Sequence, residues 1–304
     1  MALRIRPALV VVYATCAFAT LAGQAGTRVD REQLMRDLTT LAAPAMEGRR
    51  AGSAGGLKAR AWLVGRFEGA GLTPAGTSGY LQPFTAVDRN TRAAAANVIG
   101  AVAGTDRGAR TIVITAHYDH EGVRGGAIYH GADDNASGVA ALLAAARHFS
   151  TNRPRHPMLF AALDAEEMGH RGAAALLGSS LIARGDIALN VNLDMLSRSD
   201  RNEIYAAGTS YHPWIRPIVE DVATRAAVSI RFGHDSGGGE HDWTTQSDHS
   251  EFHKAGLPWV YFGVENHPDY HRPTDTADRI HAKFFGDVAD MIVDALRTFD
   301  ARLP

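Results

Sequence analysis

The chain has 304 residues, of which 45% are hydrophobic and 21% are charged. This is ordinary for a globular enzyme and enough for one large α/β domain or two small ones. The formal net charge of −2 gives no overall basic field that would attract nucleic acid. Cys16 is the single cysteine. It lies in an N-terminal segment that we expect to be removed as a signal peptide, so any metal must be held by histidines and carboxylates and no cysteine nucleophile is expected.

The first 25 residues have the pattern of a secretory signal peptide. Arg4 and Arg6 precede an apolar run over residues 8–22, and small residues allow cleavage after Ala25. The run is short for a membrane span, so the chain would contact a membrane only if this segment stayed uncleaved as an anchor. We therefore expect a secreted or periplasmic protein whose mature chain, residues 26–304, forms the folded domain and carries no disulfide.

The N-terminal part of the mature chain predicts two helices and two strands. Apolar residues at helical spacing predict helices over residues 30–41 and 57–70, the second ended by glycines. Residues 80–87 and 97–102 predict strands. A Gly-containing turn then predicts that the second strand forms an edge hairpin with the strand that begins at Thr111.

From Thr111 onward strands and helices alternate, which predicts a mostly parallel sheet with helices on both faces. Further strands are predicted over residues 157–164, 188–193, 203–207, 228–232 and 258–264. Further helices are predicted over residues 136–150, 169–177, 213–227, 250–255 and 280–299. The expected fold is a three-layer α/β/α arrangement with a mixed, mostly parallel central sheet. Residues 234–246 form a Gly-rich loop whose His234 and His241 suggest a lid.

Acidic and imidazole side chains follow several of these strands. In an α/β sheet the carboxyl ends of the strands form the edge that binds ligands. Two imidazoles and three carboxylates, one of them shared, suit a pair of metal ions such as zinc. Of two adjacent glutamates, one can bind metal while the other acts as general base. The side chains are His117 and Asp119, Asp133 and Asp134, Glu166 and Glu167, Asp194, and His267 and His271.

Each of these residues also has a structural alternative when taken singly. Asp133 or Asp134 could be a helix N-cap, and Asn135 could cap in their place. Glu166 and Glu167 could be a solvated acidic pair that favours a helix N-terminus.

Five segments together resemble the M28 family of zinc-dependent exopeptidases, of the aminopeptidase Y/S type. The segments are HYDH (117–120), GADDNASG (131–138), DAEEMG (164–169), NLDM (192–195) and YHRPTDT (270–276). The resemblance runs from about Arg28 to the C-terminus and implies the fold of the phosphorylase/hydrolase-like zinc exopeptidases. The implied metal ligands are His117, Asp134, Glu167, Asp194 and His271.

The resemblance also implies a role for each residue. Asp134 would bridge two zinc ions, with His117 and Asp194 completing one site and Glu167 and His271 the other. Glu166 would be the general base for a metal-bridging hydroxide. Asp119 would orient His117 through its ring N–H. Tyr270 would hydrogen-bond the tetrahedral oxyanion, with ordinary packing as its alternative.

The implied function is hydrolysis of the N-terminal peptide bond of a peptide with a free N-terminus. A single-zinc glutaminyl-peptide cyclotransferase, a carboxypeptidase or dipeptidase of the same family, and a non-catalytic ectodomain are the alternatives. The oligomeric state stays open. Ser247-Asp248-His249 could contact substrate or cap a helix with a surface histidine. His120 and His130 are expected at the pocket rim, and the other histidines, His170 among them, at the surface or in packing.

Overall fold

The computed structural model describes residues 28–89, 91–238 and 241–304. The predicted signal peptide over residues 1–25, with Cys16, lies outside the described residues. Among the helices of the described ranges, none combines the length and the apolar composition that a membrane span requires.

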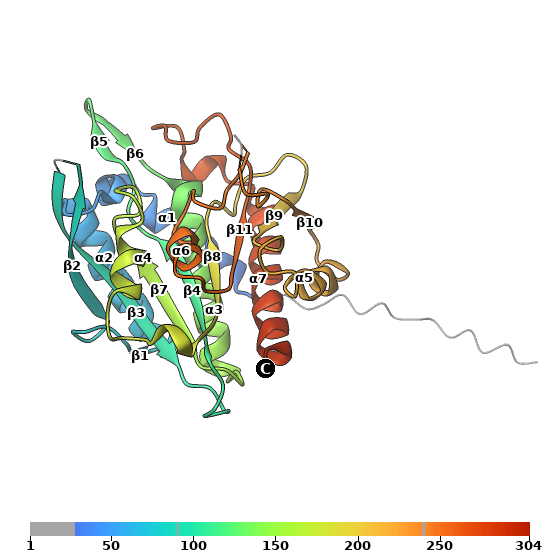
Figure 1. The fold of residues 1–304 in the computed structure, drawn as a ribbon. Helices are drawn as coiled ribbons and strands as arrows, with labels where there is room; N and C mark the ends of the chain where they lie inside the picture. Colours follow the sequence, from blue (N-terminus) through green and yellow to red (C-terminus); the bar gives the residue numbers. More distant parts are fainter. Residues whose placement is uncertain (1–27, 90, 239–240) are drawn as a thin grey trace, which may run out of the picture.

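A nine-stranded mixed sheet forms the centre of the fold (Figure 1). The strands are β1 (Thr73–Pro74), β2 (Leu81–Asp88), β3 (Thr91–Val102), β4 (Thr111–His117), β7 (Met158–Leu163), β8 (Ile187–Leu193), β9 (Glu203–Ala207), β10 (Ser229–Phe232) and β11 (Trp259–Gly263). Their order is β1-β3-β7-β4-β8-β11-β9-β10, with β2 also paired to β3. The central strands β7, β4, β8 and β11 run parallel, and antiparallel pairs flank them.

Helices cover both faces of this sheet (Figure 1). One face carries α1 (Arg31–Leu41), α2 (Ala54–Gly69), α3 (Gly138–Thr151), α5 (Arg216–Ala223) and α7 (Ala282–Arg302). The other face carries α4 (Arg171–Leu177) and α6 (His249–Lys254). Short helical turns span Pro44–Arg49, Ala132–Ser137, Arg184–Asp186 and Ala277–Arg279. The expected three-layer α/β/α fold is confirmed.

The local sequence explains where the best-predicted elements begin and why they are buried. Asp30 caps α1 by accepting the backbone N–H of Gln33 at 2.9 Å. All residues of β7 are buried, as its continuous apolar run predicts for a central parallel strand.

The predicted hairpin between β3 and β4 is wrong. β7 lies between them, antiparallel to β3 and parallel to β4. The turn after β3 bonds to the segment before β7, because Thr105 N–H donates to the carbonyl of Pro154 and Asp106 N–H to that of Arg155. This insertion gives β7 a partner on each side and satisfies both rows of its buried backbone groups.

The segment between β4 and α3 also differs from the prediction. The helix begins at Gly138 instead of residue 136, since Asp134 and Asn135 leave helical geometry in the preceding turn. The Gly-rich span before this turn forms a two-stranded hairpin, β5 (Gly122–Arg124) and β6 (Ala127–Tyr129). This hairpin projects at a corner of the molecule (Figure 1).

Candidate metal centre

The predicted ligands converge at the carboxyl edge of the parallel strands. His117 ends β4, Glu167 follows β7, and Asp194 follows β8. Asp134 enters from the irregular turn before α3, and His271 from the loop after β11. Because parallel strands end at the same edge, side chains distant in sequence meet there.

Two groups of donor atoms share Asp134. The Nε2 atom of His117 lies 3.3 Å from Asp134 Oδ1 and 3.3 Å from Asp194 Oδ1. The Nε2 atom of His271 lies 3.0 Å from Asp134 Oδ2 and 3.5 Å from Glu167 Oε2. Each carboxylate oxygen of Asp134 therefore faces a different group. Nitrogen and oxygen donors in this arrangement fit the ligand chemistry of zinc.

The electrostatics of the site favour cations. Burial by itself would lower the pKa of His117, but the Asp194 and Glu166 carboxylates outweigh burial and hold this pKa well above its ordinary value. Burial raises the pKa of Asp194, an effect that the charge of His117 opposes. Buried carboxylates this close together need compensating positive charge, which divalent metal ions supply.

His120 does not lie at the pocket rim as expected. Its side chain is buried, and Nδ1 lies 2.8 Å from Glu167 Oε1 and 3.7 Å from Asp134 Oδ2. The ligand atoms of His120, Asp134 and Glu167 also lie close enough together to hold a metal ion, as do those of Glu121, Glu167 and His271. The sequence feature that could have indicated this position is that His120 follows His117 by three residues.

Asp119 supports His117 through its backbone and the glutamates through its side chain. The ring Nδ1 of His117 is 3.2 Å from the Asp119 carbonyl oxygen but 3.8 Å from the nearer carboxylate oxygen. The carboxylate accepts the backbone N–H groups of Glu166 at 3.0 Å and Glu167 at 3.4 Å. Asp119 thus contacts the ring nitrogen of His117 through its carbonyl oxygen, and its carboxylate anchors the Glu166–Glu167 segment.

None of the residues Asp133, Asp134 and Asn135 is the N-cap of α3. Ser137 is the N-cap residue of α3, and Asn135 Oδ1 accepts the N–H of Gly138, the first residue of the helix, at 2.9 Å. Asp133 is buried and accepts the backbone N–H of Ser197 at 2.7 Å, and it lies 3.2 Å from His267 Nε2. Asp133 therefore anchors the segment after β8, which leaves Asp134 to face the other ligands.

Glu166 faces the pocket beside a histidine that sequence reasoning missed. The Nε2 atom of His170 lies 3.2 Å from Glu166 Oε1, and Ser250 Oγ lies 2.8 Å from His170 Nδ1. Burial, assisted by the charge of Lys254, lowers the pKa of His170 to about 4, so the ring is neutral at pH 7. Burial also raises the pKa of Glu166 well above its ordinary value, while His117 opposes this effect.

A cavity of about 270 Å³ contains these groups. Tyr270 lines it and stacks on the ring of His271 at a centroid distance of 4.0 Å, and burial raises the pKa of its phenol. The Gly-rich loop contributes Trp243 and Gln246 to the wall, and neither His234 nor His241. The β5–β6 hairpin contributes none of the lining residues.

Two histidines, His234 of the loop and His249 of α6, contact Trp243 instead. The ring of His234 stacks on the indole at 3.8 Å, with 5° between the ring planes. His249 is buried rather than at the surface, and its Nε2 lies 2.8 Å from the carbonyl oxygen of Trp243. His249 is absent from the lining, so the Ser247-Asp248-His249 segment supports the pocket wall from behind.

Comparison with known proteins decides the family. Residues 97–296 match the model of Peptidase family M28. The chain belongs to Peptidase family M28. The family that the five motifs predicted is thereby confirmed.

Individual relatives agree with this M28 assignment. The chain is 29% identical over 202 residues to aminopeptidase YwaD of Bacillus subtilis (strain 168), a match that covers 61% of this chain and 40% of YwaD. The chain thus spans less than half the length of this relative.

Solved structures share the M28 fold at lower identity. A zinc aminopeptidase from Bacillus subtilis superposes with a TM-score of 0.70 at 17% identity, covering 90% of this chain and 95% of that one. A glutaminyl cyclase from Bacteroides thetaiotaomicron, bound to N-acetylhistamine, gives a TM-score of 0.71 at 17% identity, covering 88% and 98%. At these identities the likeness concerns the fold alone.

Proposed function

We propose that this M28 chain is a zinc exopeptidase with two zinc ions, most consistent with an aminopeptidase that cleaves the N-terminal peptide bond. The observation that carries the proposal is the pair of donor groups that meet at Asp134, His117 with Asp194 and His271 with Glu167. Glu166 lines the same cavity. His117 and Asp194 would hold one zinc, and Glu167 and His271 the other. Zinc bound there would acidify a water and polarise the substrate carbonyl.

The chain's own residues supply the proton transfers. The Glu166 carboxylate takes a proton from the attacking water and delivers it to the leaving amine. The neutral ring of His170 donates its Nε2–H to Glu166, while Ser250 Oγ donates to Nδ1. The base is thereby held in one orientation. The Tyr270 hydroxyl donates to the oxyanion of the tetrahedral intermediate.

The first experiment tests whether Glu166 acts as the general base without binding the metal. Glu166→Ala should retain two zinc ions per chain, measured by metal analysis, while hydrolysis of an aminoacyl anilide falls by about 10²–10⁴-fold. Glu68→Ala, which removes an exposed carboxylate on α2, is the control and should leave both quantities unchanged. Near-normal turnover in Glu166→Ala would reject the role of Glu166.

A second experiment tests whether hydrolysis requires the metal and at which end the peptide is cleaved. Chelation should abolish hydrolysis, and added zinc should restore it. Peptides blocked at the N-terminus should resist cleavage, whereas peptides amidated at the C-terminus should be cleaved. The reverse preference would indicate a carboxypeptidase.

The fold of the glutaminyl cyclase neighbour makes cyclotransferase activity the second candidate. The complete set of five donor residues favours two metals over the single zinc of that alternative, and it also disfavours a non-catalytic ectodomain. One zinc per chain together with release of a lactam from a Gln-peptide would favour the cyclotransferase.

We also infer that residues 1–25 direct export and that the mature chain begins near residue 26. The charged start and the apolar run support this inference. Mass spectrometry of the protein recovered outside the cytoplasm, compared with the uncleaved chain, tests it.

A further inference from the structure

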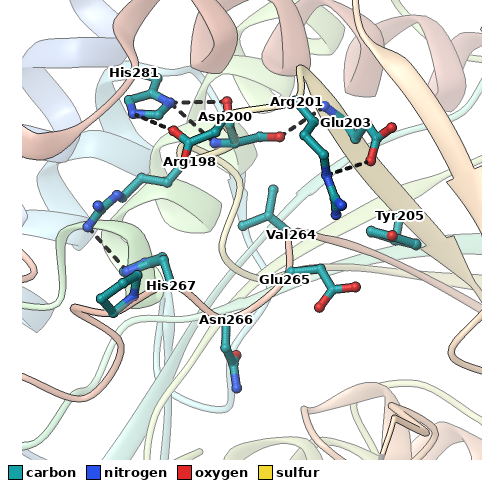
Figure 2. A pocket seen from close by; sticks show the side chains of 12 residues that line it. Arg198, Asp200, Arg201, Glu203, Tyr205, Val264, Glu265, Asn266, His267 and His281 are labelled. Carbon is teal, nitrogen blue, oxygen red and sulfur yellow. Dashed lines mark hydrogen bonds and ion pairs between the residues drawn. The ribbon is translucent and has the colours of Figure 1, made fainter.

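A second cavity of about 400 Å³, here called the outer pocket, adjoins the pocket of the metal centre. Val264 and Asn266 line both cavities, so the two share one wall along the segment after β11. Figure 2 shows this segment facing residues that follow β8 and lie in β9, among them Arg201 and Tyr205. Nothing in the proposed chemistry at Glu166 requires this second space.

The size of the inner pocket limits what it can hold. Its 270 Å³ is below the range of roughly 300–1,000 Å³ that is usual for small-molecule sites. An exopeptidase substrate places one terminal residue on one side of the cleaved bond and all of its other residues on the other side. The inner pocket accommodates the terminal residue, and the remainder needs an adjoining path.

Asn266 offers a peptide-binding group where the two cavities meet. Its residue is exposed, and no hydrogen bond joins its side chain to another residue of the described part. In Figure 2 it points away from Arg198 and His281, and it also lines the cavity of the metal centre. A carboxamide carries donors and an acceptor, which match the C=O and N–H groups of a peptide backbone.

Arg201 offers unused donors on the opposite wall. Its side chain is 67% exposed, and Nε lies 3.2 Å from Glu203 Oε2. Arg231 also pairs with Glu203, at 2.6 Å, so one carboxylate serves two guanidinium groups. The remaining N–H groups of Arg201 are free to donate to carbonyl oxygens of a ligand.

We propose that the outer pocket binds the substrate residues beyond the first, so that the preferred substrates are peptides of three or more residues. This inference rests on the proposed exopeptidase function, but it holds for either direction of cleavage. Asn266 would bond the backbone next to the cleaved bond, and Arg201 would bond carbonyl groups further along.

The test measures kcat/KM for an aminoacyl anilide and for peptides of two, three and four residues with the same first residue. We expect kcat/KM to rise at least about 10-fold from the dipeptide to the tetrapeptide. Arg201→Ala should reduce this tetrapeptide-to-dipeptide ratio by about 5-fold. Arg231→Ala is the matched control, since it removes the other partner of Glu203 outside the pocket lining, and should keep the ratio within 2-fold.

The outcomes separate the two proposals. If the anilide is hydrolysed but kcat/KM does not depend on length, or if both arginine variants lower the ratio equally, the outer pocket is not a subsite. If no peptide or anilide is hydrolysed, the proposed function fails. Calorimetry then measures how tightly di- and tetrapeptides bind to zinc-loaded Glu166→Ala. Equal affinities for the two peptides would show that the outer pocket does not bind the additional residues.

Discussion

Removal of the Arg49 guanidinium should destabilise the fold more than any surface change. Arg49 is fully buried and donates to four backbone carbonyls: those of Leu41 at 2.7 Å, Tyr118 at 2.8 Å, His130 at 2.6 Å and Gly131 at 2.9 Å. These bonds join the end of α1, the segment after β4 and the turn that carries Asp134. Burial lowers the pKa of Arg49 to about 10, so it stays charged at neutral pH.

The magnitude follows from these contacts. Hydrogen bonds to a charged group contribute roughly 1.5–3 kcal/mol each, so four give an upper limit of about 6–12 kcal/mol. Removing a buried charge recovers several kcal/mol of desolvation. We therefore expect Arg49→Met to lower the free energy of unfolding by about 4–6 kcal/mol, a large part of the roughly 5–15 kcal/mol typical of folded proteins.

Urea unfolding followed by circular dichroism measures this loss. Arg50→Met is the matched control, because Arg50 is adjacent in sequence but exposed, and it should change stability by no more than about 0.5 kcal/mol. If Arg49→Met unfolds within about 1 kcal/mol of the wild type, the buried guanidinium does not join these segments as described.

Three further predictions concern the base, the pH dependence and the core. His170→Leu should lower kcat by about 10–100-fold with little change in KM, whereas His170→Gln, which can still donate to Glu166, should retain most activity; equal losses would contradict a positioning role. Burial lowers the pKa of His249 from its ordinary value of 6.5 to about 3. The neutral ring therefore contributes its full share of the folding free energy above pH 6.5. That share is lost at about 1.4 kcal/mol per pH unit as the pH falls from 6.5 toward 3, because only the unfolded chain then takes up the proton. In urea titrations from pH 7 to 4, His249→Gln should remove that slope, and an unchanged slope would exclude His249 as its source. Leu142→Ala, in the buried face of α3, should cost about 2–5 kcal/mol by urea unfolding, and a loss no larger than that of exposed Leu57→Ala would refute this core assignment.

Local sequence patterns predicted most elements within a few residues of their observed bounds. The strand over residues 203–207 agrees at both ends, and α1 begins directly after the Asp30 cap. Such elements depend on spacing and capping within one segment, which is information that a short stretch of chain contains. The meeting of the five candidate ligands at one place was likewise predictable, because strand ends and motif order indicated one sheet edge.

The sequence by itself determined the α/β class and the family, and it predicted five candidate metal ligands. Only the tertiary structure decided how these parts are joined. It placed β7 between β3 and β4, because backbone pairing depends on partners about fifty residues apart. It turned Asp119 toward the N–H groups of the glutamates, brought His120 and His170 to them, and buried Arg49 among carbonyls. These contacts satisfy buried polar groups across separate segments, and no local pattern in the sequence specifies which segment supplies the partner.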